Sequence, residues 1–149
     1  MTTPTMRARC RRVVRDDEGA AVLEFALVAV AFLALLYGIV TFGLIFAVEQ
    51  TLTHAAAEGA RAAVSARPGD ELAESTAATQ HAIGWLGGVV AAGDVSSSIE
   101  ACEHDAAVRC VRVRIDYPYG ARPIVPPFPL LAFATPDTIR TEAVASLRS

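Results

Sequence analysis

The sequence contains no lysine, and all 13 of its basic side chains are arginine. Charged residues make up only 19% of the chain, whereas ordinary soluble domains are near a quarter charged. With 53% hydrophobic residues, the chain is too apolar to be intrinsically disordered, and it has no collagen or coiled-coil repeat. After residue 19, acidic residues outnumber arginines by thirteen to eight, which is the opposite of the charge expected for a nucleic-acid-binding domain. The composition therefore argues against nucleic acid as a partner.

Catalytic signatures are also lacking. The three histidines, His54, His81 and His104, form no His-Glu-x-x-His motif, and there is no Gly-x-Ser-x-Gly elbow or phosphate-binding glycine loop. Neighbouring carboxylates such as Asp70 and Glu71 suit the start of a helix, where negative charge is favoured. The sequence therefore predicts a protein that is not an enzyme and that needs no cofactor or metal.

One long apolar segment determines the class of protein. Phe25 to Val48 is a run of 24 residues without a charge, and the apolar character begins at Ala20. As a helix, the uncharged run would be about 36 Å long, which exceeds the ~30 Å hydrocarbon core of a bilayer. A buried core helix would need apolar cover on all sides, and the rest of the chain supplies too little. We therefore predict a single transmembrane helix over residues 20–48.

The charges on either side of this segment predict its orientation. Five arginines lie in residues 1–19, whereas Glu49 begins the other side. Because positively charged flanks stay in the cytoplasm, residues 1–19 are predicted to be a cytoplasmic leader and residues 49–149 an extracytoplasmic domain of a single-pass inner-membrane protein. Cleavage as an ordinary secretory signal, near Ala55–Ala57 or Ala62–Ala66, is the competing interpretation, although secretory apolar regions are only ~7–15 residues long.

Glu24 is an acidic residue inside the apolar stretch, one helical turn from its cytoplasmic end. An acidic side chain in mid-membrane costs about 2.5–3.5 kcal/mol on insertion scales, and less near the interface. Spacing alone leaves two interpretations open. Glu24 is either a functional carboxylate within the membrane or a residue at headgroup level that marks where the span begins.

The residues around Glu24 form a known pattern. An arginine-rich leader ends at Gly19, Ala20 follows, and Glu24 and Phe25 are the fifth and sixth residues after that glycine. This arrangement resembles the processing site of type IV prepilins and pseudopilins. The chain is also similar to the TadE family, pseudopilin-like proteins of the tight-adherence (Flp-type) pilus machinery, in the stretches EGAAVLEFALV at 18–28, LLYGIVTFG at 35–43 and AAAEGARAA at 55–63.

The resemblance implies a processing site and a set of partners. A prepilin peptidase would cut between Gly19 and Ala20, and the Glu24 carboxylate would pair with the new amine of Ala20 on a neighbouring subunit. Glu24 and Phe25 would thus help to set the register of the helices during assembly. The implied partners are the membrane, the prepilin peptidase, other pseudopilins and the inner-membrane platform of a Flp-type pilus or type II-like secretion system. An uncleaved single-pass anchor that carries an extracytoplasmic binding module is the alternative.

Beyond the apolar segment, the sequence predicts a small α+β domain of pilin-like type with an antiparallel sheet. The long helix continues past Val48 and ends at Arg67-Pro68-Gly69, because proline removes a backbone donor. Asp70 is predicted to cap a second helix that reaches about Leu86. Strands are expected at 95–99, 111–117 and 139–147, and the last two alternate apolar and polar residues. The connection at 118–136 is rich in proline and is expected to contain no central strand.

Three groups of side chains are assigned to faces of this domain. Mostly small residues at helical spacing suit close packing, on the domain's own sheet or on a sister subunit: Leu52, Ala56, Gly59 and Ala63. One face of the second helix, with Trp85 as a core anchor beside it, is expected to be buried: Leu72, Thr76, Thr79, Ile83 and Leu86. The strand arginines are expected on a solvated face, paired with acids: Arg112, Arg114 and Arg140 with Asp116 and Glu142.

Cys102 and Cys110 both lie in the predicted extracytoplasmic part, where disulfides persist. We predict a disulfide between them that closes the hairpin before the Arg112 strand. A zinc site with His104 as third ligand is the alternative, but no fourth ligand is evident and the spacing matches no standard zinc finger. Cys10, in the leader, is expected to be a reduced thiol.

Overall fold

A computed structural model describes the backbone of residues 7–126 and 134–147, and within these ranges the side chains from Gly19 onward. The chain divides into two units, residues 1–41 and residues 42–149, and one helix, α1 (Arg7–Ser65), contributes to both. The side chain of Cys10 and part of the proline-rich connection lie outside the described residues.

The first unit contains the apolar part of α1. Alanine and leucine are frequent there, and both are strong helix formers. A helix of a soluble domain buries one apolar face. Here large apolar side chains are exposed all round the helix: Val22, Leu23, Phe25, Leu27, Val28, Val30, Phe32, Leu33, Leu35, Leu36, Ile39 and Val40. Within the described part of the chain, the stretch Gly19–Ser65 of α1 is the one helix long and apolar enough to cross a membrane.

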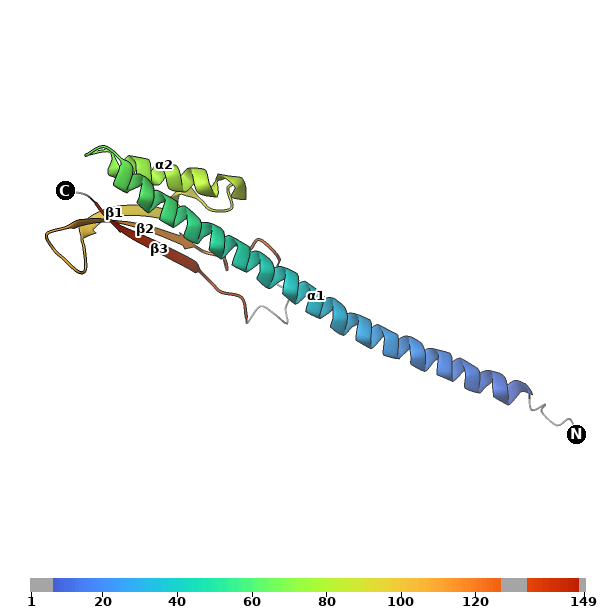
Figure 1. The fold of residues 1–149 in the computed structure, drawn as a ribbon. Helices are drawn as coiled ribbons and strands as arrows, with labels where there is room; N and C mark the ends of the chain where they lie inside the picture. The colour runs from blue at the N-terminus through green and yellow to red at the C-terminus, as the bar shows by residue number, and fades with distance from the viewer. Residues whose placement is uncertain (1–6, 127–133, 148–149) are drawn as a thin grey trace, which may run out of the picture. The chain divides into compact units, whose positions relative to one another are not determined.

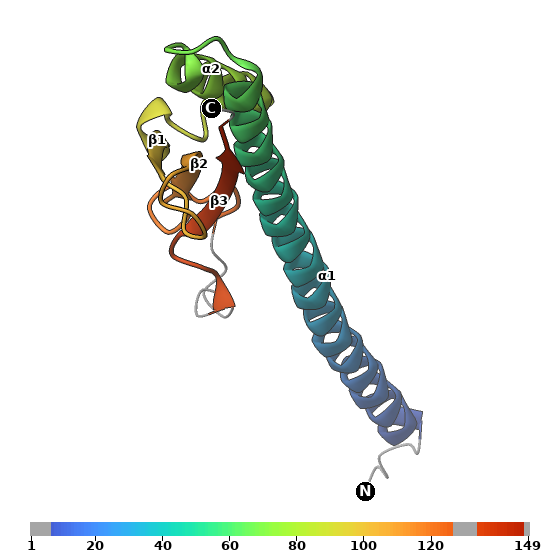
Figure 2. The ribbon, with the colours of Figure 1, turned by 60° about the vertical axis from the view of Figure 1, so that its left-hand side comes forward.

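The second unit is an α+β domain, as predicted. After α1 come α2 (Glu71–Ile83), the short 3-10 helices η1 (Gly84–Leu86) and η2 (Ala92–Asp94), and three strands. The strands β1 (Val95–Ala101), β2 (Arg109–Tyr117) and β3 (Ile139–Ser146) form an antiparallel sheet with β2 in the centre. In this register Val113 pairs with both Ser97 and Ala143. The sheet and α2 lie beside the C-terminal part of α1 (Figures 1 and 2).

The core of this unit lies between β2 and α1. Alternation along β2 turns Val111, Val113, Ile115 and Tyr117 inward, and each is 0% exposed. These residues form one hydrophobic cluster with α1 side chains that include Leu52, Ala56 and Ala63. Leu52, Ala56 and Ala63 therefore pack within their own domain, whereas Gly59, on the same stripe, lies against α2 and not against the sheet. Burial of each large side chain contributes roughly 1.5–3 kcal/mol.

The turn between the helices differs in one detail from the prediction. Residue 70 occupies the N-cap position of α2, but the side chain of Asp70 makes no capping hydrogen bond. The carboxylate of Glu71 instead accepts the backbone N–H of Gly69 at 2.7 Å. Gly69 adopts a φ of 99°, a conformation that residues with a Cβ rarely adopt. The hydrogen bond from Gly69 thus fixes the turn that precedes α2, and it does not replace the missing cap on the first N–H groups of the helix.

The buried face of α2 is shifted from the predicted one. Its buried residues are Glu71, Ser75, Thr79 and Ile83. Leu72 is 40% exposed, and Trp85, expected to be a core anchor, is 68% exposed. Both expectations were wrong: α2 carries few large apolar side chains, so its pattern fits neighbouring faces almost equally well, and Trp85 lies beyond α2, in η1.

The outer face of the sheet is a network of ion pairs, as predicted. Arg112 and Arg114 both pair with Glu142 across the β2–β3 register, with Arg114 Nη2 2.8 Å from Glu142 Oε2. Arg140 Nε lies 2.9 Å from Asp116 Oδ1 in the same way. The hydrogen bond from Arg114, together with the attraction of Arg112, holds the pKa of Glu142 below its ordinary value of 4.5. The backbone N–H groups of Glu71 itself and of Gly69 likewise lower the pKa of the Glu71 carboxylate.

We expect acid to destabilise the domain through these two carboxylates. A group whose pKa is lower in the folded state stabilises the fold above its unfolded pKa and loses that effect as the pH falls through its folded pKa. Thermal midpoints measured by circular dichroism should therefore fall as the pH is lowered below 4.5. The variant Glu142→Gln should flatten this dependence, whereas Glu74→Gln, at an exposed position on α2, should not. Parallel curves for Glu142→Gln and the parent protein would contradict the assignment.

Candidate functional site: the exposed apolar helix and the disulfide hairpin

The predicted processing site lies within the continuous helix α1. Gly19 and Ala20 are helical and exposed, and a Cβ added at Gly19 would meet no atom within 4 Å. Glycine lowers helix stability by about 1 kcal/mol relative to alanine, so the backbone unwinds more easily at this position than at its neighbours. A protease needs its substrate in an extended conformation. Gly19 thus marks a point where local opening of an exposed helix costs little.

Glu24 lies one turn further along the same helix and is exposed. Its neighbours Leu23 and Phe25 are exposed as well, so the carboxylate sits on a helix with an apolar surface. Among the residues whose side chains are described, none forms an ion pair with Glu24. A carboxylate in such surroundings gains strongly from a positively charged partner, because attraction between charges rises as the dielectric constant falls.

The small-residue sites that an ordinary signal peptidase would need are inside the fold. Ala55 and Ala56 are 0% and 1% exposed, and Ala63 is also buried. All three belong to the core cluster of the second unit. Cleavage there would remove α1 from the core that it helps to build, so the folded domain does not favour the secretory-signal interpretation.

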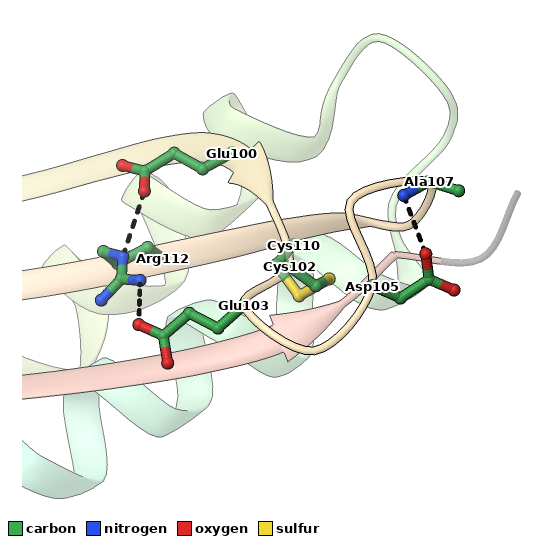
Figure 3. Close-up of a disulfide and its surroundings, with 7 residues drawn as sticks. All are labelled: Glu100, Cys102, Glu103, Asp105, Ala107, Cys110 and Arg112. Carbon is green, nitrogen blue, oxygen red and sulfur yellow. Dashed lines mark hydrogen bonds and ion pairs between the residues drawn. A yellow bond between two sulfur atoms is a disulfide. The ribbon is translucent and has the colours of Figure 1, made fainter.

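The disulfide between Cys102 and Cys110 is present at the end of the β1–β2 hairpin (Figure 3). The two Cα atoms are 5.1 Å apart, and the loop between them is closed further by the N–H of Ala107, which donates to Asp105 Oδ1 at 2.9 Å. Since both sulfurs are bonded to one another, they are not thiolate ligands for zinc. Within the described residues, no group of three or more His, Cys, Asp or Glu side chains is placed to hold a metal ion.

Replacement of both cysteines by serine is expected to destabilise the domain by roughly 2.5 kcal/mol on the chain-entropy model, because a short loop is freed in the unfolded state. Reduction of the parent protein should lower its thermal midpoint to about that of the double variant. The midpoint of the double variant should not change when reductant is added. Circular dichroism with and without dithiothreitol measures both effects. An unchanged midpoint in the double variant would show that the strand pairing alone holds the hairpin.

Beside the disulfide, Arg112 is surrounded by acidic side chains. Figure 3 shows Arg112 directed toward Glu100 and Glu103, and the structure places its guanidinium nitrogens 3.4 Å from a carboxylate oxygen of each. A cavity of about 360 Å³ lies at this point and is lined by residues that include His104 and Glu142. One arginine faces three carboxylates here, those of Glu100, Glu103 and Glu142, so its ion pairs stabilise the hairpin end while the cavity keeps a net negative charge.

A second hollow is lined by α1, the end of α2 and η1. We call it the Trp85 groove, with a volume of about 540 Å³, lined mainly by Gln50, Thr53, His54 and Ala57 of α1 with Ala82 and Trp85. The three histidines lie on different elements, His54 on α1, His81 on α2 and His104 in the hairpin loop, and in the described residues they form no metal-binding group. His81 is exposed.

Sequence reasoning missed Arg122, which anchors the start of the proline-rich connection. Its guanidinium donates to both carboxylate oxygens of Asp94, at 2.7 and 2.6 Å, and to the carbonyl oxygen of Val89 at 3.1 Å. It also lies 5.6 Å from the centre of the Tyr117 ring, and the Tyr117 hydroxyl donates to the Arg122 carbonyl oxygen. No local pattern connects Arg122 with Asp94, so only the folded structure identifies this contact.

Comparison with known proteins gives the segment a family. Residues 19–61 match the sequence model of the family described as TadE-like protein. The chain therefore carries a TadE-like segment. No curated protein and no solved structure matches the chain significantly. The TadE-like segment begins at the glycine of the predicted processing site and includes Glu24, the exposed apolar helix and the first buried turns of the second unit.

The TadE-like segment and the apolar helix together indicate a membrane-anchored protein related to Tad pilus assembly. The match ends at residue 61, so it covers none of α2 or the sheet. What the family comparison describes is thus the helix that carries Gly19 and Glu24, whereas the α+β domain is known from the structure.

Proposed function

We propose that this protein is a pseudopilin-like subunit or assembly factor of a Flp-type pilus, inserted in the inner membrane and processed after Gly19. Residues 1–19 are the cytoplasmic leader, residues 20–48 the membrane helix and residues 49–149 the extracytoplasmic domain. The prepilin peptidase, other pseudopilins and the inner-membrane platform of the system are its partners. One observation carries the proposal: an exposed carboxylate on an apolar helix, five residues after the glycine where the TadE-like segment begins.

Processing creates a positively charged partner for the Glu24 carboxylate. Hydrolysis of the Gly19–Ala20 amide consumes one water and leaves a carboxylate on Gly19 and an amine, protonated at neutral pH, on Ala20. In the membrane this ammonium group and the Glu24 carboxylate of a neighbouring subunit satisfy one another. A pair of buried charges is stable only when both partners are present, so the contact forms in one register and disfavours others.

The membrane orientation follows from the flanking charges and from the chemistry of the domain. The arginine-rich leader holds the N-terminus in the cytoplasm. The disulfide between Cys102 and Cys110 belongs in an oxidising compartment, which lies on the other side of the membrane. The two arguments are independent and favour the same topology.

Gly19→Val is expected to block processing, because a β-branched side chain stiffens the backbone and hinders close approach to the scissile bond. The full chain is produced together with a prepilin peptidase and examined by intact mass and N-terminal sequencing. The parent protein should begin at Ala20, and the variant should keep its leader.

Gly43→Val is the matched control, since it makes the same substitution at an exposed position of the same helix, where an added Cβ meets no atom within 4 Å. It should be processed like the parent. An intact leader on the parent protein in peptidase-positive cells would contradict the proposal and would favour an uncleaved membrane anchor with an extracytoplasmic binding module.

A further inference from the structure

Trp85 is the only tryptophan of the chain and is two-thirds exposed, at 68%. It lies in η1, directly after α2, and forms one wall of the Trp85 groove against α1. A tryptophan side chain offers 150–250 Å² of surface, most of it apolar, as an order of magnitude. Leaving such a side chain in water gains nothing for a soluble domain, so its position calls for a physical account.

The groove lies at one end of an apolar face of α1. Phe46, Gln50, Thr53 and Ala57 follow one another at intervals of four, three and four residues, so they share one face of the helix. Phe46 is 61% exposed, and the next residue on this face, Gln50, is polar. The Trp85 groove therefore begins where this open face of α1 changes from apolar to polar.

No linker separates the apolar run from the domain. The core of the second unit reaches along α1 as far as Ile45 and Val48, both buried, while the uncharged run itself continues to Val48. The run and the core thus overlap by about one helical turn. Gln50 and Thr53 lie roughly 3 and 7.5 Å beyond Val48 along the helix axis. The headgroup layer on each side of a bilayer is about 5–7 Å thick.

The chemistry of the groove suits that layer. Its lining contains no carboxylate, so anionic headgroups are not repelled. The Thr51 and Thr53 hydroxyls donate to the carbonyl oxygens of Ala47 and Glu49, both at 2.8 Å, so these hydroxyls need no other partner. Tryptophan is enriched at membrane–water interfaces, because its ring is apolar and its indole N–H requires an acceptor.

We propose that the Trp85 groove contacts the lipid headgroups of the extracytoplasmic leaflet and that Trp85 anchors the domain at a fixed height on the membrane. The occupant of the groove is lipid, not another protein chain. This inference rests on the proposed function, since α1 must cross the membrane for the groove to lie at that height.

Because Trp85 is the only tryptophan, its fluorescence reports this contact directly. The full chain is reconstituted into phosphatidylcholine vesicles that contain phosphatidylcholine spin-labelled either at the headgroup or deep in the acyl chain. We expect Trp85 emission to be shifted to shorter wavelength than in the unfolded protein. We also expect it to be quenched more strongly by the headgroup label than by the deep label.

Two variants in a Trp85→Phe background calibrate the depth. Ile39→Trp places the probe at an exposed position on the same face of α1, about 13.5 Å from Val48 along the helix axis and so near the middle of the hydrocarbon core, and should be quenched more by the deep label. Leu72→Trp places it at an exposed position in the first turn of α2, roughly 17 Å from the last turn of α2 along its axis, and should be quenched by neither.

Three results would overturn the inference. If Trp85 is quenched no more than the Leu72→Trp probe, its side chain lies in water. Trp85 emission that depends on the protein-to-lipid ratio, with no response to either label, would show that a second protein chain covers the groove. Failure of the chain to float with the vesicles would remove the membrane span, and with it both this inference and the proposed function. Flotation without quenching would contradict the inference alone.

Discussion

Replacement of Gly59 by alanine is expected to destabilise the domain of residues 42–149 by about 2–3 kcal/mol, in the upper part of the ~1–3 kcal/mol range usual for overpacking a core. Gly59 of α1 lies directly against α2. A Cβ at this position would lie 2.0 Å from Thr79 Oγ1 and 3.1 Å from the Ser75 carbonyl oxygen. Because Ser75 belongs to the backbone of α2, the helices must move apart or the Thr79 side chain must leave its position.

The Thr79 side chain cannot move without cost. It is fully buried, and its hydroxyl donates to the Ser75 carbonyl oxygen at 2.8 Å. Alanine at position 59 would by itself favour the helix by about 1 kcal/mol, so any destabilisation measured is a lower limit for the clash. Urea unfolding of the detergent-solubilised chain, followed by circular dichroism, measures the difference in free energy of unfolding.

A second substitution tests the cause. Thr79→Ala removes the oxygen at 2.0 Å and leaves the Thr79 Cβ position at 3.4 Å, an ordinary contact distance. The double variant Gly59→Ala/Thr79→Ala should therefore recover much of the stability lost by Gly59→Ala, whereas Gly59→Ala/Thr79→Ser should not. Additive effects of the two substitutions would mean that the helices do not meet at this point.

The same contact explains where sequence reasoning succeeded and where it failed. In β2, large β-branched residues alternate with charged ones, so one face is clearly apolar and the predicted register of burial is correct. In α2, the residues against Gly59 are Ser75 and Thr79, which are small and polar. Their burial follows from the close approach of two helices, and hydrophobic periodicity does not detect such a surface.

Trp85 was misplaced for a different physical reason. The expected face extended helical spacing to Leu86, but α2 ends at Ile83 and the chain continues as a 3-10 turn. A tighter turn rotates the residues after Ile83 away from the direction that 3.6 residues per turn would give. The predicted helix, which reached Leu86, corresponds to α2 and η1 together. Trp85 lies in η1, so its side chain does not point in the direction that a continuous α-helix would give it.

The processing motif could be found from the sequence because all its parts are local. Gly19, Ala20 and Glu24 lie within two helical turns of one another, and their spacing is itself the signal. Arg122 and Asp94, in contrast, are 28 positions apart and meet only when η2 and the end of β2 are in place. Contacts of this kind depend on the topology of the domain, and the pattern of strands in the sequence does not predict that topology.

Glu24→Gln is expected to reduce the yield of assembled pili more than about tenfold while leaving membrane insertion and processing intact. Loss of one partner from a buried ion pair costs about 3–5 kcal/mol, because the other charge remains without compensation, and each 1.4 kcal/mol is a factor of ten. Glutamine keeps the size of the side chain and is cheaper to place in lipid, so insertion should not suffer. Sheared filaments quantified by immunoblot give the yield, and intact mass gives the extent of processing.

Glu49→Gln is the matched control, because it removes an exposed carboxylate at the other end of the apolar segment. It should leave the yield of pili unchanged, so that a loss in Glu24→Gln reflects position and not net charge. Glu24→Asp keeps the charge on a shorter side chain and should restore part of the yield. If Glu24→Gln assembles at the parental level, the carboxylate lies at the headgroup level and only marks where the span begins. If assembly fails because the leader is retained, Glu24 acts in recognition by the peptidase, and its pairing with the Ala20 amine would be wrong.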